Sequence, residues 1–270
     1  MENWTGNPFD DSEAVSHLGA LARRSSEYEE WLLHQLKSRG CTKVLDVACG
    51  TGVDSITLLN NNMEVVSCDD AEAMLCHARK ERPRMKNESH DISWDIIRAN
   101  WLTLQEDLPG YRDFGSSIFH LIDSLPELPL YRQCLTNFKH FLKPGGLLLI
   151  DHRNMDSILD RGFAVNKNVY HEIDTVKSIS TNIKEKDGSP ALVEITYDMI
   201  VDNTGGSTTN RKDEQEVPVT MPLTPLRVHK FGDLLKEVFG EKCEYSLYGD
   251  LRPFDGEKEI AYFQHSVENI

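Results

Sequence analysis

A short hydrophobic run that leads into a glycine turn constrains this chain most strongly. Val44–Gly52 reads V-L-D-V-A-C-G-T-G, and its apolar residues are typical of a short buried strand. Gly50 and Gly52 permit a tight turn and a close approach of the backbone to a ligand. Val53–Asn60 then has helical spacing. Strand, glycine turn and helix together predict the first unit of a doubly wound α/β fold that binds a nucleotide.

An acidic residue after the second predicted strand supports a nucleotide ligand. Glu64–Cys68 is the second hydrophobic run, and Asp69 follows it. A carboxylate at this place, about 20 residues past the turn, can accept hydrogen bonds from both hydroxyls of a ribose. A βα turn with no ligand is the alternative, but the whole motif with its acid disfavours it.

The spacing of the glycines distinguishes between cofactors. A dinucleotide turn has the pattern G-x-G-x-x-G, whereas the third glycine position here is Ser55. A nicotinamide-dependent dehydrogenase is therefore a poor interpretation. The string D-x-x-C-G-T-G instead resembles the first motif of S-adenosylmethionine-dependent methyltransferases. That resemblance implies that the turn receives the methionine part of the cofactor and that Asp46 supports the turn.

Composition excludes several classes of partner. The 270 residues carry a net charge of −15, which argues against nucleic acid and anionic membranes, because both attract clusters of Lys and Arg. Leu147–Ile150 is the longest aliphatic run and is too short to span a bilayer. Met1–Gly6 has neither the basic nor the apolar part of a secretion signal. We therefore expect a cytoplasmic protein.

The cysteines and histidines predict neither a disulfide framework nor a metal site. Six cysteines are scattered along the chain without a C-x-x-C pair, and the ten histidines do not form H-E-x-x-H. Disulfides would require an oxidising compartment, and zinc sites need closely spaced ligands. The sequence therefore predicts no metal cofactor.

The alternation of predicted elements indicates the fold class. Helices are expected over residues 23–39, 53–60, 71–82, 130–142 and 231–239, and strands over 44–47, 64–68, 95–99, 147–150, 242–248 and 259–267. This order predicts an α/β fold with a doubly wound, mainly parallel sheet. Strands at 169–182 and 191–201, followed by a polar loop at 204–216, predict a small inserted antiparallel β subdomain.

Four segments follow from this organisation. Residues 1–22 form an N-terminal arm, and residues 23–152 form the Rossmann-like core that binds the cofactor. Residues 153–230 form a β subdomain that acts as the lid and binds the substrate. Residues 231–270 supply a helix and strands that complete the core sheet.

Several strings resemble glycine N-methyltransferase, from about Phe9 to Val267. The most specific are V-L-D-V-A-C-G-T-G-V-D-S and I-D-H-R-N, which end at Ser55 and Asn154. The resemblance implies a cytosolic homotetramer in one-carbon metabolism that moves the methyl group of S-adenosylmethionine to glycine, giving sarcosine and S-adenosylhomocysteine. It also implies folate binding at subunit interfaces.

The resemblance also implies site residues. Those expected to bind the cofactor are Phe9, Arg24, Ala48, Gly50, Asp69, Asn100, Trp101, Gly115, Ser116 and His120. Those expected to bind the substrate are Arg153, Tyr170 and Tyr197. Arg24 would meet the cofactor carboxylate, Asp69 the ribose, and Asn100 with Trp101 the adenine. No strong base is apparent, so the protein is expected to act by positioning, with water as a proton acceptor.

Some of these residues have a plainer interpretation. Arg153 could grip the carboxylate of the amino-acid substrate or pair with Asp151 or Asp156, and its place just past the end of a sheet strand favours the first role. Asn100 and Trp101 could be a strand end with a core indole. His120 could line the cofactor pocket or be solvated.

One departure from the family bears on the fold. The resemblance implies a buried strand before the segment that begins at Gly115, but here Asp113-Phe114 runs directly into Gly115. A sheet without a central strand would leave unpaired backbone groups in the core. Either Ser117–Ile122 slips in register to take its place, or the sequence is a splice form, a faulty gene model or a pseudoenzyme.

Three functions follow from these observations. The first is methyl transfer to glycine. The second keeps the reaction and changes the acceptor to sarcosine, dimethylglycine or another small amine, because several tyrosines of the family differ here. The third is a catalytically weak protein that binds S-adenosylmethionine or folate.

Overall fold

The computed structural model describes residues 23–81, 93–119, 125–171, 176–202, 214–256 and 259–270. An eight-stranded sheet with the order β10-β9-β11-β5-β4-β1-β2-β3 forms its centre. The strands are β1 Lys43–Asp46, β2 Glu64–Asp69, β3 Trp94–Arg98, β4 Phe114–Phe119, β5 Leu142–Arg153, β9 Tyr245–Gly249, β10 Arg252–Pro253 and β11 Tyr262–Asn269. The five strands from β5 to β3 are mutually parallel, and β11 pairs antiparallel with both β5 and β9. The predicted doubly wound, mainly parallel sheet is confirmed.

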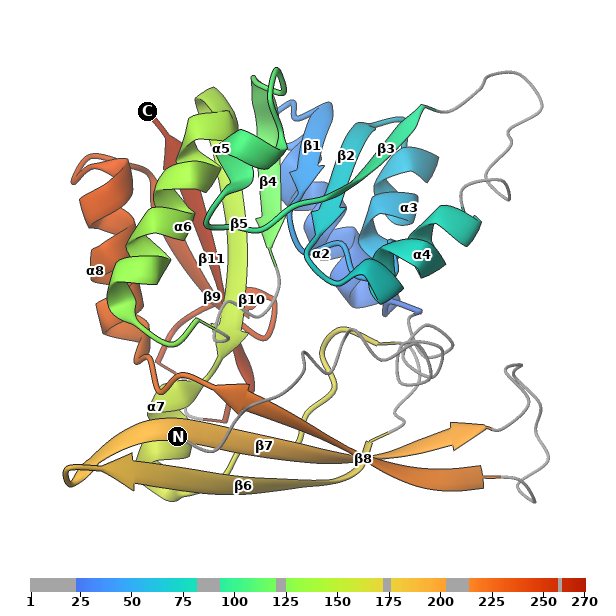
Figure 1. The fold of residues 1–270 in the computed structure, drawn as a ribbon. Helices are drawn as coiled ribbons and strands as arrows, with labels where there is room; N and C mark the ends of the chain where they lie inside the picture. The colour runs from blue at the N-terminus through green and yellow to red at the C-terminus, as the bar shows by residue number, and fades with distance from the viewer. Residues whose placement is uncertain (1–22, 82–92, 120–124, 172–175, 203–213, 257–258) are drawn as a thin grey trace.

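Helices cover both faces of the large sheet (Figure 1). They are α2 Ser26–Lys37, α3 Val53–Asn60, α4 Glu72–Glu81, α5 Leu104–Asp107, α6 Leu128–Phe141 and α8 Val228–Phe239, while α7 Met155–Arg161 follows β5. Alternate side chains of β5 point to opposite faces, as the pleat of a strand requires. Leu148 and Ile150 pack with α6 and α8, whereas Leu147 and Leu149 pack with α2 and α3.

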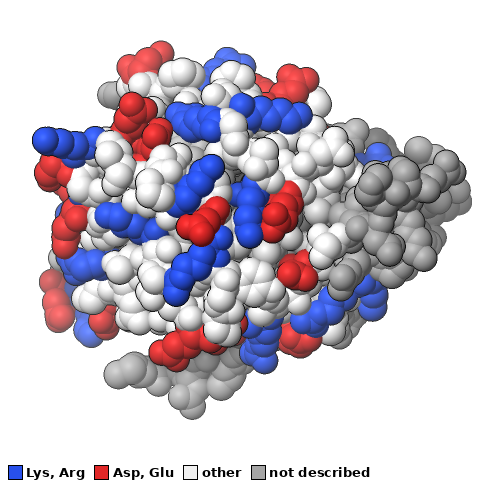
Figure 2. Space-filling view, turned by 90° about the horizontal axis from the view of Figure 1, so that it is seen from above, with Lys and Arg blue, Asp and Glu red and all other residues white. Residues whose placement is uncertain are grey.

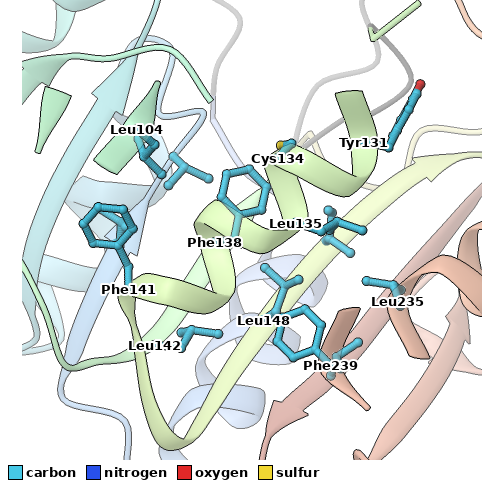
Figure 3. Packing of buried hydrophobic residues seen from close by; sticks show 14 of the residues in the cluster. Leu104, Tyr131, Cys134, Leu135, Phe138, Phe141, Leu142, Leu148, Leu235 and Phe239 are labelled. Carbon is cyan, nitrogen blue, oxygen red and sulfur yellow. The ribbon is translucent and has the colours of Figure 1, made fainter. Parts of the chain in front are cut away.

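The packing of α6 shows why its sequence forms a helix. Its buried apolar residues recur at spacings of three and four, which places them on one stripe; they are Tyr131, Cys134, Leu135, Phe138 and Phe141. Figure 3 shows this stripe facing β5 and α8, where Leu148, Leu235 and Phe239 complete the cluster. The apolar periodicity that predicted this helix is therefore the periodicity of its contact with the sheet.

The large sheet contains the strand that the sequence comparison suggested was missing. β4 lies between β1 and β5 and pairs parallel with both. The sheet therefore has no gap at this place. Of the two alternatives, the first is closer to the structure, because β4 contains Ser117–Phe119, although it begins earlier, at Phe114. Small residues make this possible: a Cβ on Gly115 would lie 3.3 Å from Cys41 Cα, and the Ser116 hydroxyl donates to the Leu147 carbonyl over 2.8 Å. Pairing of this segment satisfies backbone groups that a gap would leave unpaired.

A separate three-stranded antiparallel sheet has the order β6-β7-β8. It comprises β6 Val176–Lys186, β7 Ser189–Asp202 and β8 Glu214–Leu223. The sequence predicted the first two strands but missed β8, whose first residues fell in the predicted loop at 204–216. β6 also starts later than predicted, because Val169 and Tyr170 are buried against α2 instead of joining the strand. Figure 1 shows this sheet below the edge at which β5 ends.

The surface charge follows no single sign on the face seen from above. Figure 2 shows Lys and Arg side chains interspersed with Asp and Glu on that face. The net charge of −15 is thus not accompanied there by a continuous basic surface of the kind that nucleic acid attracts. Within the described ranges, no helix combines the length and apolar character needed to cross a membrane.

Candidate active site

The glycine turn after β1 meets the end of β2. Gly50 and Gly52 have φ of +52° and +87°, which glycine adopts without a steric penalty. The Gly50 N–H donates to Asp69 Oδ2 over 3.0 Å, and the Ala71 N–H donates to Asp69 Oδ1 over 2.9 Å. Burial raises the pKa of Asp69, and the two N–H donors partly oppose that rise. Asp69, the residue predicted to bind a ribose, therefore also fixes the turn.

The space beside the turn is asymmetric. Among the described residues, a Cβ on Gly50 would meet only Met74 Sδ, at 3.9 Å, whereas a Cβ on Gly52 would lie 2.7 Å from the Trp94 ring. Gly50 is therefore less crowded by these residues, and Gly52 allows the start of α3 to lie against the Trp94 side chain of β3. This arrangement fits a nucleoside ligand whose substituent on the ribose passes along the Gly50 backbone.

A buried chain of hydrogen bonds joins the strands that flank the turn to the start of α3. Trp94 Nε1 donates to Ser67 Oγ over 2.7 Å, and the Ser67 and Ser55 hydroxyls are 2.6 Å apart. Ser55 Oγ donates to Asp46 Oδ2 over 2.6 Å. Because the indole can only donate and the Asp46 carboxylate can only accept, the chain runs in one direction. Ser67 and Trp94 were not among the predicted residues. The only indication of this network in the sequence was Ser55, which stands where a dinucleotide turn has its third glycine.

Asn100 and Trp101 follow the carboxyl end of β3. Asn100 Nδ2 donates to Asp70 Oδ2 over 2.9 Å. Trp101 Nε1 donates to the Val47 carbonyl over 2.7 Å, and its half-buried ring packs on the core together with Ala48. The structure thus brings Ala48, Asn100 and Trp101 to the same edge as the glycine turn.

Arg24 connects the segment before α2 to the first turn of α3. Its Nε and Nη2 donate to the two carboxylate oxygens of Asp54 over 2.9 and 2.6 Å, a bidentate geometry that fixes the guanidinium plane. Burial tends to lower the pKa of Arg24, but the Asp54 carboxylate outweighs it and the pKa lies above its ordinary value. The Arg24 guanidinium also lies 5.2 Å from the centre of the Tyr28 ring and 6.0 Å from that of Tyr170.

Arg153 is a fully buried cation at the end of β5. It is 1% exposed, and its Nε donates to the Tyr197 hydroxyl over 3.2 Å. Its guanidinium lies 4.2 Å from the centre of the Tyr262 ring and 5.5 Å from that of Tyr197. Tyr197 belongs to β7, so the small sheet completes the surroundings of this arginine. Such a cation, held between aromatic rings, is suited to binding a carboxylate.

Tyr170 links the two arginines. Its hydroxyl accepts from Gln264 Nε2 over 2.8 Å, and its ring centre is 5.2 Å from that of Tyr28 and 5.0 Å from that of Tyr262. Burial and a hydrogen bond with Asp151 raise the pKa of Tyr170. Arg24, Tyr170, Tyr262 and Arg153 therefore form one continuous set of contacts. Tyr262 was not among the predicted site residues, and nothing in the sequence distinguishes it from a core tyrosine.

Two predicted residues lie away from the glycine turn, and two others fall outside the described residues. The structure places Gly115 and Ser116 at the beginning of β4, where Ser116 is paired with Val44 near the start of β1. They are buried at the opposite end of the strands from the glycine turn, so a contact with a cofactor at the carboxyl edge is inconsistent with this placement. The resemblance implied that Gly115 and Ser116 follow the central strand, whereas in the structure they are part of that strand. Phe9 and His120 lie outside the described residues.

In the part of the chain that the structure describes, no group of three or more His, Cys, Asp or Glu side chains could hold a metal ion. What the edge offers is a glycine turn beside a carboxylate, and a buried arginine within a set of tyrosines. These groups can bind a nucleoside and a small carboxylate side by side.

The chain is similar in sequence to a known family of proteins. The sequence model of the family described as "Methyltransferase domain" matches residues 38–196. A glycine N-methyltransferase of Rattus norvegicus is 37% identical over 273 residues, covering 96% of this chain and 92% of the relative. A glycine/sarcosine/dimethylglycine N-methyltransferase of Actinopolyspora halophila is 30% identical over 250 residues, covering 91% of this chain and 39% of the relative.

Solved structures agree with the fold. An S-adenosylmethionine-dependent methyltransferase from Clostridium acetobutylicum has a TM-score of 0.64 at 14% identity, with 90% of each chain covered. The glycopeptide N-methyltransferase MtfA complexed with S-adenosyl-L-homocysteine has a TM-score of 0.54 at 15% identity, covering 91% of this chain and 87% of that one. At this level of identity the likeness concerns the fold alone.

Proposed function

We propose that this chain, which belongs to the family of glycine N-methyltransferases, transfers the methyl group of S-adenosylmethionine to the amine of glycine. The products are sarcosine and S-adenosylhomocysteine. The observation that carries the proposal is the buried Arg153 guanidinium, held against Tyr197 and Tyr262 at the edge where the glycine turn lies. An amino acid has one carboxylate and one amine, and a single fixed arginine is sufficient to orient it.

The residues expected to bind S-adenosylmethionine lie around the glycine turn. Gly50 leaves open space on its ligand side, and Asp69 lies at the end of β2, where its carboxylate can accept from ribose hydroxyls. Asn100 and Trp101, which lie at the same edge, would flank the adenine. Arg24 is bound to Asp54, so a cofactor carboxylate would share this arginine with Asp54.

The chain contributes mainly by positioning. Bound S-adenosylmethionine supplies an electrophilic methyl group on a sulfonium. Arg153 would hold the substrate carboxylate through two parallel hydrogen bonds, which aims the amine at that methyl and replaces a bimolecular encounter with a fixed geometry. Tyr197 contacts this guanidinium directly, and Tyr170 packs on Tyr262, which also contacts it. The attacking amine must be neutral, and its proton can leave to water.

Sarcosine is the second candidate acceptor, and relatives favour it. Two relatives that cover more than nine-tenths of this chain are named as methyltransferases for both glycine and sarcosine. Sarcosine retains the carboxylate that Arg153 would bind and still carries a methylatable amine. Comparing initial rates with glycine, sarcosine and dimethylglycine at equal concentrations distinguishes the acceptors.

The resemblance also supports assembly and location proposals. A homotetramer, a folate site at its subunit interfaces and a cytoplasmic place in one-carbon metabolism are all properties of the family. Light scattering after size-exclusion chromatography would measure the mass of the assembly against the 30.7 kDa chain. Titration with a reduced folate, followed by fluorescence, would measure folate affinity.

The decisive test is the formation of S-adenosylhomocysteine with and without glycine. We expect glycine-dependent product from the wild type. We expect Arg153→Ala to lower kcat/KM for glycine by about 10²-fold or more, because the substrate carboxylate loses a buried charged partner. Arg153→Lys should restore little, since a lysine cannot form two parallel bonds.

Two controls make the result specific. Arg132→Ala removes an exposed arginine that pairs with Glu237 on the helical surface and should leave turnover unchanged. Calorimetric titration with S-adenosylmethionine should give the same Kd for wild type and Arg153→Ala. Tight cofactor binding by a wild type that methylates none of the three amines would instead favour the binding-protein interpretation.

A further inference from the structure

The turn between β9 and β10 has a backbone that its sequence does not favour. Asp250 and Leu251 are its two central residues, with φ of +46° and +70°, and Gly249 pairs with Arg252 across it. A two-residue hairpin with positive φ at both centres is usually Asn-Gly or Asp-Gly. Leucine at the second position has no such preference, so the surrounding contacts must hold this conformation.

Asp250 is held by contacts from two other segments. Its Oδ1 accepts from the N–H groups of Ala261 and Tyr262, each over 3.0 Å, and its own N–H donates to the Tyr262 carbonyl over 3.0 Å. Its Oδ2 forms an ion pair of 2.6 Å with Lys167 Nζ, and the Asp250 side chain is only 5% exposed. The carboxylate therefore fixes the backbone at the start of β11.

Leu251 is held through Gln264. The Leu251 N–H donates to Gln264 Oε1 over 2.9 Å, and its side chain is buried in the cluster that contains Tyr170. Gln264 is 2% exposed, and its Nε2 donates to the Tyr170 hydroxyl. The amide of Gln264 thus connects the turn directly to a predicted substrate residue.

The other arm of the network ends on Arg153. Tyr262 is opposite Arg153 in the pairing of β11 with β5, and the guanidinium lies 4.2 Å from the centre of its ring. Lys167, which pairs with Asp250, lies two residues after Val165, whose carbonyl accepts from Arg153 Nη1 over 3.5 Å. Both arms of the network therefore reach the groups around the substrate.

We propose that the Asp250–Leu251 turn is a positioning device that fixes Arg153 through Tyr262 and fixes Tyr170 through Gln264. Asp250 is a positioning residue, since it touches neither substrate nor cofactor. The inference rests on the proposed function in one respect, the role of Arg153 in binding glycine. Its structural content, that Asp250 sets the place of the Arg153 guanidinium, does not depend on turnover.

The chain provides a matched control turn. Asp187 and Gly188 join β6 to β7 with φ of +54° and +73°, and Asp187 is exposed. Asp187→Ala therefore changes the same residue type at the same position of a comparable turn, away from Arg153. It should leave kcat and KM for glycine unchanged.

The test compares Asp250→Ala and Asp250→Asn with the wild type. We expect Asp250→Ala to raise KM for glycine and lower kcat, together up to about 10²-fold, as displacements of about 1 Å do in other sites. The Kd for S-adenosylmethionine should stay unchanged. Asp250→Asn keeps an oxygen for the two N–H donors and should recover most of kcat/KM. A folded Asp250→Ala with wild-type KM and kcat would overturn the proposal.

A second variant and a second measurement keep the test decisive. If Asp250→Ala does not fold, Gln264→Leu removes the amide that holds Leu251 and Tyr170, and it should also raise KM for glycine; wild-type KM would overturn the proposal. A crystal structure of Asp250→Ala, or of Gln264→Leu if Asp250→Ala does not fold, shows whether the Arg153 guanidinium or the Tyr170 ring has moved relative to Tyr262. Movement in a protein whose wild type makes no sarcosine would refute the proposed function and retain the positioning role, whereas unchanged geometry and kinetics in that variant would refute the positioning role alone.

Discussion

Individual residues of the glycine turn have separable tasks. Among the described residues, a Cβ on Gly50 would meet only Met74 at ordinary contact distance, whereas a Cβ on Gly52 would collide with the Trp94 ring. Under the proposed function the first glycine gives a ligand access, and the second lets the start of α3 lie against Trp94. Asp69 joins the two tasks, since it holds the Gly50 N–H and lies at the predicted ribose site. The motif in the sequence is therefore both a binding element and a packing element.

Replacing Gly52 with alanine tests this division. Gly52→Ala adds a Cβ 2.7 Å from the Trp94 ring at a φ of +87°, so we expect a loss of about 2–4 kcal/mol in the free energy of unfolding and weaker binding of S-adenosylmethionine. Gly110→Ala is the control, because Gly110 has the same φ of +87° and nothing within 4 Å. Urea unfolding measures both; equal losses would mean that backbone strain alone, without the Trp94 contact, explains the effect.

At the scale of elements, β5 presents different chemistry on its two faces. Arg153 and Asp151 point to the face of α2 and the tyrosines, while His152 points to the opposite face, against Phe231 of α8. There His152 stacks on His265 of β11, with ring centres 4.9 Å apart, and both rings are fully buried. Tyr245 Oη is 2.9 Å from His265 Nδ1. The antiparallel pairing of β5 and β11 thus produces a buried imidazole pair directly behind the site.

This pair predicts acid sensitivity. Burial lowers the pKa of His152 to about 4, with Asp151 and Asp156 partly opposing it, and burial and His152 lower the pKa of His265. Both pKa values lie below the unfolded value of about 6.5, so the unfolded chain binds more protons between about pH 6.5 and 4. The stability is present above pH 6.5 and should fall by about 1.4 kcal/mol per pH unit for each histidine as the pH drops.

Urea unfolding at pH 7.5 and pH 5 measures this slope. His152→Phe should flatten it, since the replacement cannot be protonated and is surrounded by Phe231, Phe263 and His265. His229→Gln is the control, because His229 is an exposed histidine near the start of α8. An unchanged slope in His152→Phe would show that other groups cause the acid sensitivity.

At the scale of the molecule, the small sheet and the glycine turn both lie at the carboxyl edge of the parallel strands. β1, β2 and β3 end beside the glycine turn, β5 ends at Arg153, and β7 of the small sheet supplies Tyr197. A ligand at this edge therefore contacts segments that are distant in the sequence. Binding should stabilise the whole chain, because a ligand that binds only the folded state adds its binding free energy to folding.

Thermal unfolding with added cofactor checks this. At a concentration of S-adenosylmethionine 100 times its Kd, the gain is about 2.7 kcal/mol, which corresponds to a rise in Tm of roughly 5 °C for a chain of this size. Glycine alone should produce no comparable shift if the carboxylate site forms fully only beside the cofactor. The absence of a shift with S-adenosylmethionine would contradict the proposed cofactor site.

Local patterns in the sequence determined much of this molecule. The apolar runs of β1 and β2, the helical spacing of α3 and α6 and the positive-φ glycines of the turn were all readable, because strand pleat, helix period and glycine freedom are properties of short segments. The family and its methyl-transfer chemistry followed from motifs of the same length. Arg153 was identified through the resemblance to the family, and its place directly after a buried strand favoured the substrate role.

Only the tertiary structure decided the long-range relations. It showed that Phe114–Phe119 forms the central strand, which moved Gly115 and Ser116 away from the site, because strand register depends on which neighbours are available to pair. It also revealed β8 and the contacts of Tyr262 and Asp250 with the residues around Arg153. These depend on residues separated by a hundred positions or so along the chain, and no local pattern records a contact that forms only when the sheets are assembled.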